Sequence, residues 1–387
     1  MDRERVWFDV KIAFVYLGGR LRRQQLNEDV PSEFFLGARE LKARDHDVKL
    51  LEVGEALHQD WRATLLSRTV SKGILPAKTY IDLYKGLEAL LPSLMDREVV
   101  IGTTSGLAFG LAFWRWRRHL SCEVMGIQCG ITHYPIGWCS RMSSRFLFRR
   151  MHTQLYATSE LEWMRSFFGI PADLIEANPF GVDTAFWTPG EQSTVKQGTA
   201  ISPYVLAVGN DAQRDYDTLI RAADGARWRL ILVTHRPLPA ALPENVKIVR
   251  GSYTEGIDDA ELRDLYRKAA CVVVPLKPGL QPSGQSVALQ AMACGATVVL
   301  TRTEGLFDTA RLQDGKQLLL VEPENPKALR SAIKRLLTDK VLRNFLAEEG
   351  RDYVLRHCRI EDFAGRLEQL CQRVVNDNQG SKSPLVS

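Results

Sequence analysis

The sequence predicts an α/β protein with two domains, each built around a parallel β-sheet. The chain has 387 residues, more than one ordinary hydrophobic core organises. Short, almost wholly apolar segments alternate with helical ones twice over, which is typical of parallel sheets covered by helices on both faces. A polar stretch with Pro and Gly, residues 184–203, separates the two series. We therefore expect two Rossmann-like, doubly wound domains that face each other across a cleft.

The expected strands are the apolar runs, and turn or helical residues follow each of them. In the first half the runs are residues 10–18, 47–53, 98–104 and 122–129, with a helix around 32–44. In the second half they are residues 204–209, 229–234, 246–251, 271–276, 296–301 and 318–323, with helices at 216–223 and 286–294.

These elements divide the chain into five parts. The N-terminal domain is expected at residues 1–183, the linker at 184–203 and the second domain at 204–360. A C-terminal helix at 361–376 is expected to pack back towards the first domain, and residues 377–387 are expected to form a disordered tail.

Composition and charge narrow the class of protein. Hydrophobic residues make up 45% and charged residues 25% of the chain, as in soluble globular proteins. Acidic residues nearly balance the basic ones, and no nucleic-acid-binding module is recognisable, so we expect no nucleic-acid partner. The seven cysteines form no Cys-x-x-Cys pair, and the first residues lack a signal-peptide pattern. These features together predict a cytoplasmic protein with reduced cysteines.

A loop rich in small residues opens the helix at 286–294. The free backbone N–H groups at a helix N-terminus bind anions, so residues 281–284 are a candidate phosphate site. The alternative is that Ser283 or Ser286 merely caps the helix. The loop follows the strand at 271–276, and ligands of such sheets bind at the carboxyl ends of strands. That position favours the anion site.

A second loop leads to the same edge of the expected sheet. Residues 209–214 follow the first strand of the second domain and end in Arg214, whose guanidinium can bind phosphate oxygens in a fork. The alternative is a surface ion pair of Arg214 with Asp215 or Asp217.

Five segments, taken in order, resemble one known family, the family 4 retaining glycosyltransferases of GT-B fold. They are LKARDHDVKLLEV (41–53), ANPFGVDTAFWTP (177–189), YVLAVGNDAQRDYDTLIRA (204–222), SGQSVALQAMACGATVVLT (283–301) and GKQLLLVEPENPKALRSAIKRLL (315–337). The last three resemble the part of the family's second domain that binds the nucleotide sugar. The resemblance covers about 300 residues.

The resemblance implies a reaction. A sugar passes from a nucleotide-sugar donor to an acceptor, which is a glycan, a lipid-linked molecule or a small molecule. The transfer retains the anomeric configuration and needs no metal, and no cofactor is implied beyond the donor itself. Negative charge builds on the leaving nucleoside diphosphate, and fixed N–H dipoles together with Arg214 would stabilise it.

The sequence departs from the family at its pair of glutamates. The position that faces the nucleoside ribose is Gln290, whose amide can still pair with hydroxyls, and an ungapped alignment puts Pro282 at the sugar-facing position. Gln285, Ser286 or Glu304 are candidates to replace the lost carboxylate.

The remaining donor-side positions also follow from the resemblance. The family's arginine is Asn210 here and its lysine is Arg214, and Lys277 is expected as a second cation beside it. We expect Arg214, Lys277 and His133 to be catalytic. The full set of expected donor-binding residues is Gly209, Asn210, Ser283, Gly284, Gln285, Ser286, Gln290 and Glu304.

The acceptor is expected at the first domain, in two loops that follow strands. The expected acceptor-side residues are Gly18, Gly19, Arg20, Thr104 and Ser105. His133 follows the strand that ends near residue 129, and a His in this part of the fold contacts the transferred sugar in relatives. The alternative for His133 is a plain surface residue.

Two stretches of the first domain mix cations with aromatic residues. They are residues 106–118 (GLAFGLAFWRWRR) and 141–150 (RMSSRFLFRR). Such stretches are typical of helices that lie on anionic membranes, so we expect peripheral membrane contact through the first domain. The alternative is a helix packed on the core with a solvated basic side.

Two other classes of function stay open at this stage. A sugar-nucleotide epimerase or a phosphorylase can use the same scaffold, since fold does not fix function. The missing glutamate pair and the basic aromatic stretches are also compatible with a non-catalytic protein that binds nucleotide sugars.

Overall fold

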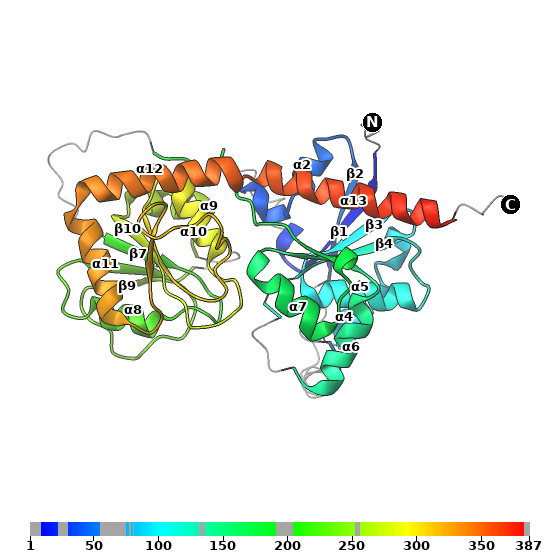
Figure 1. Ribbon diagram of the computed structural model, residues 1–387, viewed down its shortest axis with the longest axis horizontal. Helices are drawn as coiled ribbons and strands as arrows, with labels where there is room; N and C mark the ends of the chain where they lie inside the picture. Colours follow the sequence, from blue (N-terminus) through cyan, green and yellow to red (C-terminus); the bar gives the residue numbers. More distant parts are fainter. Residues whose placement is uncertain are drawn as a thin grey trace. The chain divides into compact units, whose positions relative to one another are not determined.

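The computed structural model describes most of the chain in two compact units (Figure 1). The described residues are 9–21, 30–54, 75–76, 79, 81–128, 130–131, 136–190, 204–251 and 256–382. The first unit comprises Met1–Glu28, Phe34–Pro179 and Glu361–Ser387, and the second comprises Asp29–Glu33 and Phe180–Ile360. A short segment before residue 34 therefore belongs with the second unit, although its neighbours in sequence belong to the first.

A parallel sheet with the strand order β2-β1-β3-β4-β5-β6 forms the centre of the first unit. Its described strands are β1 (Lys11–Leu17), β2 (Asp47–Val53), β3 (Val99–Gly102), β4 (Glu123–Gln128), β5 (His152–Leu155) and β6 (Ile175–Ala177). The first four confirm the expected strands. The apolar-run criterion missed β5, which begins with the polar residues His152, Thr153 and Gln154, and β6, which has only three residues.

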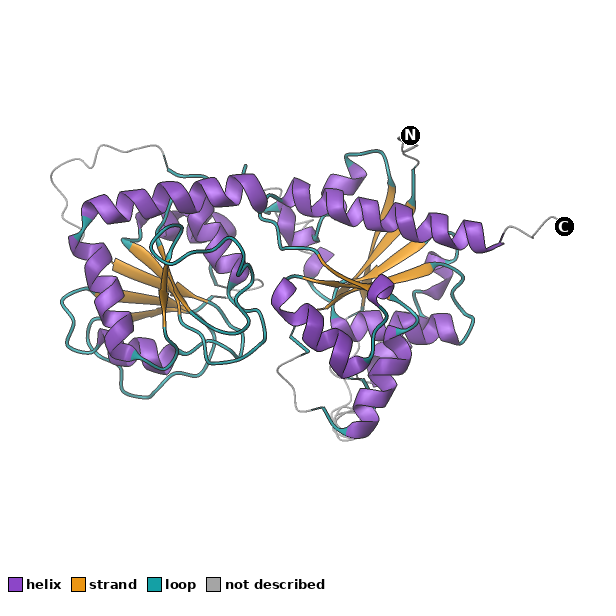
Figure 2. Ribbon diagram, in the orientation of Figure 1, coloured by secondary structure: helices purple, strands orange, loops and turns teal. Residues whose placement is uncertain are grey.

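Helices cover both faces of this sheet (Figure 2). They are α2 (Ala38–Lys42), α4 (Ile81–Glu88), α5 (Ser105–Trp116), α6 (Trp138–Phe148), α7 (Leu161–Phe168) and α13 (Ile360–Lys382), with the short 3-10 turns η1 (Ser32–Phe35), η3 (Leu91–Leu94), η4 (Thr158–Glu160) and η5 (Ala172–Leu174). The single helix expected at 32–44 is wrong. Leu36 and Gly37 have φ values of 54° and 84°, which a right-handed helix does not accommodate, so η1 and α2 are separate.

The C-terminal helix α13 packs on the first unit beside α2 (Figure 1). His46 Nε2 lies 2.9 Å from Glu368 Oε1, and Arg366 Nε donates to Asn178 Oδ1 at 2.7 Å. The helix continues to Lys382, so residues 377–382 are helical where a disordered tail was expected.

Helix α5 is a core helix over most of its length. Leu107, Phe109 and Leu111, which the sequence suggested for a membrane-facing side, are fully buried, so the interfacial assignment of this part is wrong. Small residues explain the close packing, because a Cβ at Gly102 would lie 2.5 Å from the backbone N of Ala108. None of the helices in the described ranges combines the length and the apolar character needed to cross a membrane.

The second unit repeats the architecture, with the strand order β12-β11-β10-β7-β8-β9 in a parallel sheet. The described strands are β7 (Tyr204–Val208), β8 (Arg229–Val233), β9 (Val246–Val249), β10 (Cys271–Val274), β11 (Val298–Thr301) and β12 (Leu319–Val321), and they confirm all the expected strands of this half. The helices are α8 (Tyr216–Ala223), α9 (Asp259–Lys268), α10 (Gln285–Ala293), α11 (Pro326–Thr338) and α12 (Lys340–His357).

Both sheets contain a point where the winding of the chain reverses. In the second unit the chain runs from β7 outward through β8 to β9 and then returns to β10 on the other side of β7. In the first unit the same reversal lies between β1 and β3. Ligands of doubly wound sheets bind at such points, outside the carboxyl ends of the strands. The loops after β7 and β10 therefore define the candidate site of the second unit.

Candidate functional site

Helix α10 begins without a side-chain cap. Its N-cap residue is Gly284, at a φ of 74°, and within the described part of the chain the helix start has no side-chain cap hydrogen bond. Ser283 instead donates its hydroxyl to Asp211 Oδ1 at 2.7 Å. The capping alternative is therefore wrong, because neither Ser283 nor Ser286 caps the helix. The first N–H groups of α10 are available to an anion.

Arg214 lies beside this helix start and is buried, with only 4% of its surface exposed. Its Nε donates to the carbonyl of Val208 at 3.1 Å and lies 3.3 Å from Asp211 Oδ2. Its Nη1 is buried and has no hydrogen-bond partner in the described part of the chain. The expected alternative, a surface ion pair with Asp215 or Asp217, is not what the structure contains.

Two glycines make room for the guanidinium. A Cβ at Gly284 would lie 2.7 Å from Arg214 Nη1, and a Cβ at Gly209 would collide with Arg214 Nε. Both glycines also have positive φ values, of 74° and 143°. The unpartnered Nη1 therefore faces the uncapped start of α10, where a guanidinium and helical N–H groups together favour an anion.

The loop after β7 is held in place by its own side chains. Asn210 Oδ1 accepts the backbone N–H of His235 at 2.6 Å, and Asn210 Nδ2 donates to the carbonyl of Gly251 at 3.2 Å. Arg236 Nη1 donates to the carbonyl of Asp211 at 2.8 Å. Asn210 therefore fixes the backbone from which Arg214 extends, and donor contact by Asn210 stays a prediction.

Gln290 is tied into the interior of the second unit. Its Nε2 donates to Glu33 Oε1 at 3.0 Å, and its Oε1 accepts the hydroxyl of Tyr266 at 3.3 Å. Glu33 Oε1 also accepts Trp187 Nε1 at 2.6 Å, and Glu33 Oε2 accepts the backbone N–H of Asp183 at 2.9 Å. These bonds engage the amide that the sequence assigns to the ribose, and the ribose contact stays a prediction.

Glu33 is a buried acid that sequence reasoning missed. Burial raises the pKa of Glu33 from its ordinary 4.5 to about 7, against the opposing effect of the hydrogen bond from Gln290. Its side-chain partner Trp187 lies 154 positions away in the sequence, and no local pattern marks such a pair. The only sequence signal is an acid flanked by the phenylalanines of SEFF.

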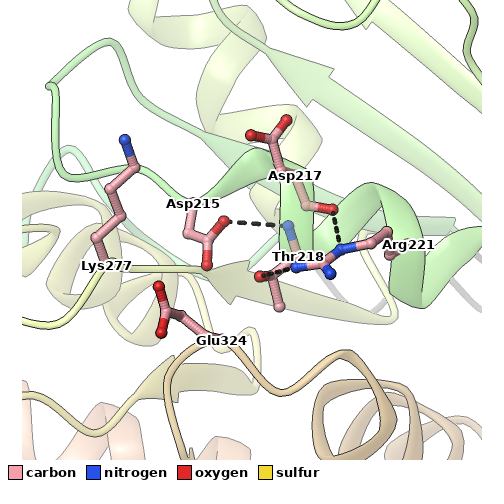
Figure 3. A pocket seen from close by; sticks show the side chains of 6 residues that line it. All are labelled: Asp215, Asp217, Thr218, Arg221, Lys277 and Glu324. Atoms are coloured by element: carbon pink, nitrogen blue, oxygen red, sulfur yellow. Dashed lines mark hydrogen bonds between the residues drawn. The ribbon is translucent and has the colours of Figure 1, made fainter.

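Lys277 lines a pocket whose lining does not include Arg214. The pocket has a volume of about 410 Å³ and is also lined by Asp215, Asp217, Thr218, Arg221 and Glu324 (Figure 3). Asp215 accepts the backbone N–H of Thr218 at 3.0 Å and so caps α8. A catalytic role for Lys277 stays a prediction.

The candidates for the missing sugar-facing carboxylate differ in exposure. Gln285 is buried at the first position of α10, and its Oε1 has no partner among the described residues. Ser286 is half-buried, and Glu304 is exposed. Gln285 therefore combines a place at the helix start with free hydrogen-bonding capacity.

The expected acceptor-side residues lie in the first unit at the reversal between β1 and β3. After Gly18 and Gly19, the side chain of Arg20 donates to the carbonyl of Phe34 at 2.5 Å and stacks 4.6 Å from the centre of the Phe34 ring. Thr104 caps α5 by accepting the N–H of Leu107 at 3.4 Å. The hydroxyl of Ser105 is buried without a partner among the described residues. His133 lies outside the described residues.

Acidic residues do not gather into a metal centre in the described ranges. The chain has two Asp-x-Asp triplets, at 45–47 and 215–217. No group of three or more His, Cys, Asp or Glu with the geometry to hold a metal ion occurs among the described residues.

Solved structures with the same architecture cover nearly the whole chain. A sucrose-phosphate synthase from Thermosynechococcus elongatus superimposes with a TM-score of 0.69 at 18% identity, over 95% of this chain and 99% of that one. The Anabaena protein HepE, in complex with UDP and glucose, superimposes with a TM-score of 0.63 at 14% identity, over 94% and 99% of the two chains. The protein has the two-domain GT-B fold.

Sequence comparison finds a family match within the second unit. Residues 202–339 match the family described as "Glycosyl transferases group 1". A D-inositol 3-phosphate glycosyltransferase from Acidothermus cellulolyticus is 29% identical over 202 residues, which is 46% of this chain and 44% of that protein. The match thus spans less than half the length of this relative. Residues 202–339 are therefore similar to group 1 glycosyltransferases, and this similarity lies within the second unit.

Proposed function

We propose that this protein transfers a sugar from a nucleotide sugar to an acceptor, and that the diphosphate of the donor binds at the start of α10. One observation carries the proposal: Arg214 Nη1 is buried without a hydrogen-bond partner among the residues that the structure describes, beside an uncapped helix start. An unpaired guanidinium N–H in such a place is costly unless a ligand satisfies it. A diphosphate supplies both the charge and the acceptor oxygens that this arrangement lacks.

The same groups suit the chemical step. Cleavage of the glycosyl–phosphate bond leaves negative charge on the nucleoside diphosphate, and the α10 N–H groups and Arg214 are already aimed at that charge. One such preorganised donor contributes about 3 kcal/mol to transition-state stabilisation, so two or three account for a large share of a typical enzymatic barrier reduction.

We also propose that the transfer proceeds with retention and without a metal or other cofactor. The resemblance to the retaining enzymes supports retention, and a phosphate oxygen of the leaving group can accept the acceptor's proton when attack comes from the same face. Proton NMR of the first product formed would report its anomeric configuration. A turnover rate that is unchanged by EDTA is expected, and a loss restored by a divalent ion would contradict the metal-free scheme.

UDP is the first nucleotide to test, because the fold neighbour HepE was solved with UDP and glucose. For the acceptor we propose a glycan or a lipid-linked molecule bound at the first unit, near Arg20 and Thr104. We place the reaction in the cytoplasm, at the surface of a membrane, which would bring a lipid-linked acceptor within reach.

The test compares two arginines of the second unit. Arg214→Ala should abolish the thermal stabilisation given by UDP and lower donor turnover by about a hundredfold or more, because it removes the proposed phosphate ligand. Arg221→Ala is the matched control, since Arg221 is exposed and its guanidinium donates to Asp217 and Thr218 of its own helix, α8. If the two variants gave the same thermal stabilisation by UDP and the same donor turnover, Arg214 would not be part of the donor site.

Donor consumption without acceptor separates the alternatives. A transferase consumes the donor and releases nucleoside diphosphate only when an acceptor extract is added, apart from slow hydrolysis. An epimerase converts the nucleotide sugar with no acceptor present, and a non-catalytic protein binds the donor without consuming it under any condition.

A further inference from the structure

Helix α6 carries an exposed apolar stripe. Trp138, Met142 and Phe146 are spaced four residues apart and so lie along one side of the helix, and Trp138 is 75% exposed. The ring of Trp116, at the end of α5, meets Phe146 edge-to-face with 5.3 Å between ring centres and is itself exposed. We call these four side chains the α6 stripe.

The stripe is unusual for the exposed side of a surface helix, which is normally polar. The buried side of α6 contains Ser140 and Ser144, whose hydroxyls donate to the carbonyls of Leu75 and of Ser140, both at 2.7 Å. The same side also buries Leu147 and Phe148, so α6 carries large apolar residues on its core side and on its exposed side. Exposing large apolar side chains in a row is unfavourable in water, and such a patch marks a surface that meets a partner.

The surroundings of the stripe are basic. Arg117, Arg118 and Arg149 are exposed, and the guanidinium of Arg150 lies 3.7 Å from the centre of the Phe146 ring. The sequence has no Asp or Glu between residues 106 and 121 or between 136 and 150. Arg115 is not part of this set, because it pairs with Glu123 and donates to the carbonyl of Arg150 at 3.2 Å.

We propose that the α6 stripe and its arginines are a docking surface for an anionic lipid bilayer. Tryptophan rings favour the headgroup region of a membrane, and arginines beside them are attracted by anionic lipids. The two stretches that supply these arginines contain no Asp or Glu, which fits a surface that is negative throughout, whereas the surface of a protein partner mixes both signs. The surface takes in part of both stretches that the sequence suggested, 141–150 on α6 and the end of 106–118, and leaves out the buried part of α5.

The second unit provides a matched control. Helix α12 also exposes two apolar residues four positions apart, Val341 and Phe345. Glu348 is exposed on the same helix, so this surface is not purely basic. Removing Val341 and Phe345 changes exposed apolar area by a comparable amount and should leave lipid binding unchanged.

The experiment is vesicle flotation of the full chain at low salt. The wild-type protein should float with vesicles of phosphatidylglycerol and phosphatidylcholine and stay at the bottom with phosphatidylcholine alone. The triple variant Arg117→Glu, Arg118→Glu, Arg149→Glu should bind anionic vesicles at least about a hundredfold more weakly, given the contribution of each arginine near a charged surface. Trp138→Ser with Met142→Ser should also weaken flotation, and Val341→Ser with Phe345→Ser should not.

Two controls keep the outcome clear. Circular dichroism and the UDP-induced thermal shift should be the same in all variants, because none of these residues belongs to the donor site. A failure of lipid binding and a failure of the proposed transferase function are therefore separate results. The proposal would be overturned if the wild-type protein still floated at about 500 mM salt and the triple variant also floated with anionic vesicles. The proposal would also be overturned if the wild-type protein stayed at the bottom with anionic vesicles. The α6 stripe would then be a contact surface for a protein partner.

Discussion

The two units have the same kind of sheet and the same reversal of winding, but they treat the polar groups at that place differently. In the first unit, Thr104 caps α5 and the guanidinium of Arg20 bonds to the carbonyl of Phe34. In the second unit, α10 starts at Gly284 with no side-chain cap, and Arg214 Nη1 is left without a partner among the described residues. The same fold can therefore either pair the donors at a helix start within the protein or leave them available to a ligand.

The largest expected effect follows from the glycine at the open helix start. Gly284→Ala should destabilise the protein by about 2 kcal/mol and abolish UDP binding, because the residue has a positive φ and its Cβ would meet Arg214 and Val274. Gly19→Ala in the first unit also has a positive φ, but nothing lies within 4 Å of its Cβ. It should cost about 1 kcal/mol and leave UDP binding intact. Urea unfolding and calorimetric titration measure the two quantities, and equal loss of UDP binding in both variants would contradict the comparison.

A second effect concerns Glu33, which accepts a hydrogen bond from Gln290 on the buried side of α10. Burial raises the pKa of Glu33 to about 7 in the folded protein, so the native state holds a proton that the unfolded chain loses near pH 4.5. Stability from this group is therefore present at low pH and is lost as the pH rises to about 7.

Glu33→Gln should remove this dependence. Between pH 5 and pH 8 the wild-type free energy of unfolding should fall by about 2 to 3 kcal/mol more than that of the variant. Urea unfolding at both pH values would measure the difference. Parallel pH profiles for the two proteins would show that Glu33 is ionised in the native state.

The smallest effect tests the caps directly. Thr104→Ala should lower the stability of the unliganded protein by about 1 kcal/mol, because it removes the N-cap of α5. Ser286→Ala should change it by less than about 0.5 kcal/mol, since Ser286 caps nothing in α10. A larger loss for Ser286→Ala than for Thr104→Ala in urea unfolding would reverse the assignment of capped and open helices.

The fold of the second unit could be predicted almost completely from the sequence, because its strands are short apolar runs and a buried parallel strand needs little else. Helix α5 shows the limit. An apolar segment that ends in Trp and Arg has the same composition whether it lies in a core or on a membrane, and Gly102 and Gly126, which let α5 approach the sheet, lie outside the segment itself.

The candidate site could be predicted only in part. Arg214 and the loop before α10 were found because loops after parallel strands meet at one edge of the sheet. The partners of Gln290 could not be found, since Glu33 is 257 positions away and only the folded chain brings the two together. Hydrogen bonds between distant segments leave no periodic signal in a single sequence.

The most direct test of the central claim is a calorimetric titration of UDP into the wild-type protein, Arg214→Ala and Arg20→Ala. We expect Arg214→Ala to weaken UDP binding by about a hundredfold, or about 2.7 kcal/mol, because the variant loses the unpartnered guanidinium N–H at the open helix start. Arg20→Ala should bind UDP as the wild-type protein does, since Arg20 is already bonded to Phe34 in the other unit. Wild-type affinity in a folded Arg214→Ala protein would contradict the account.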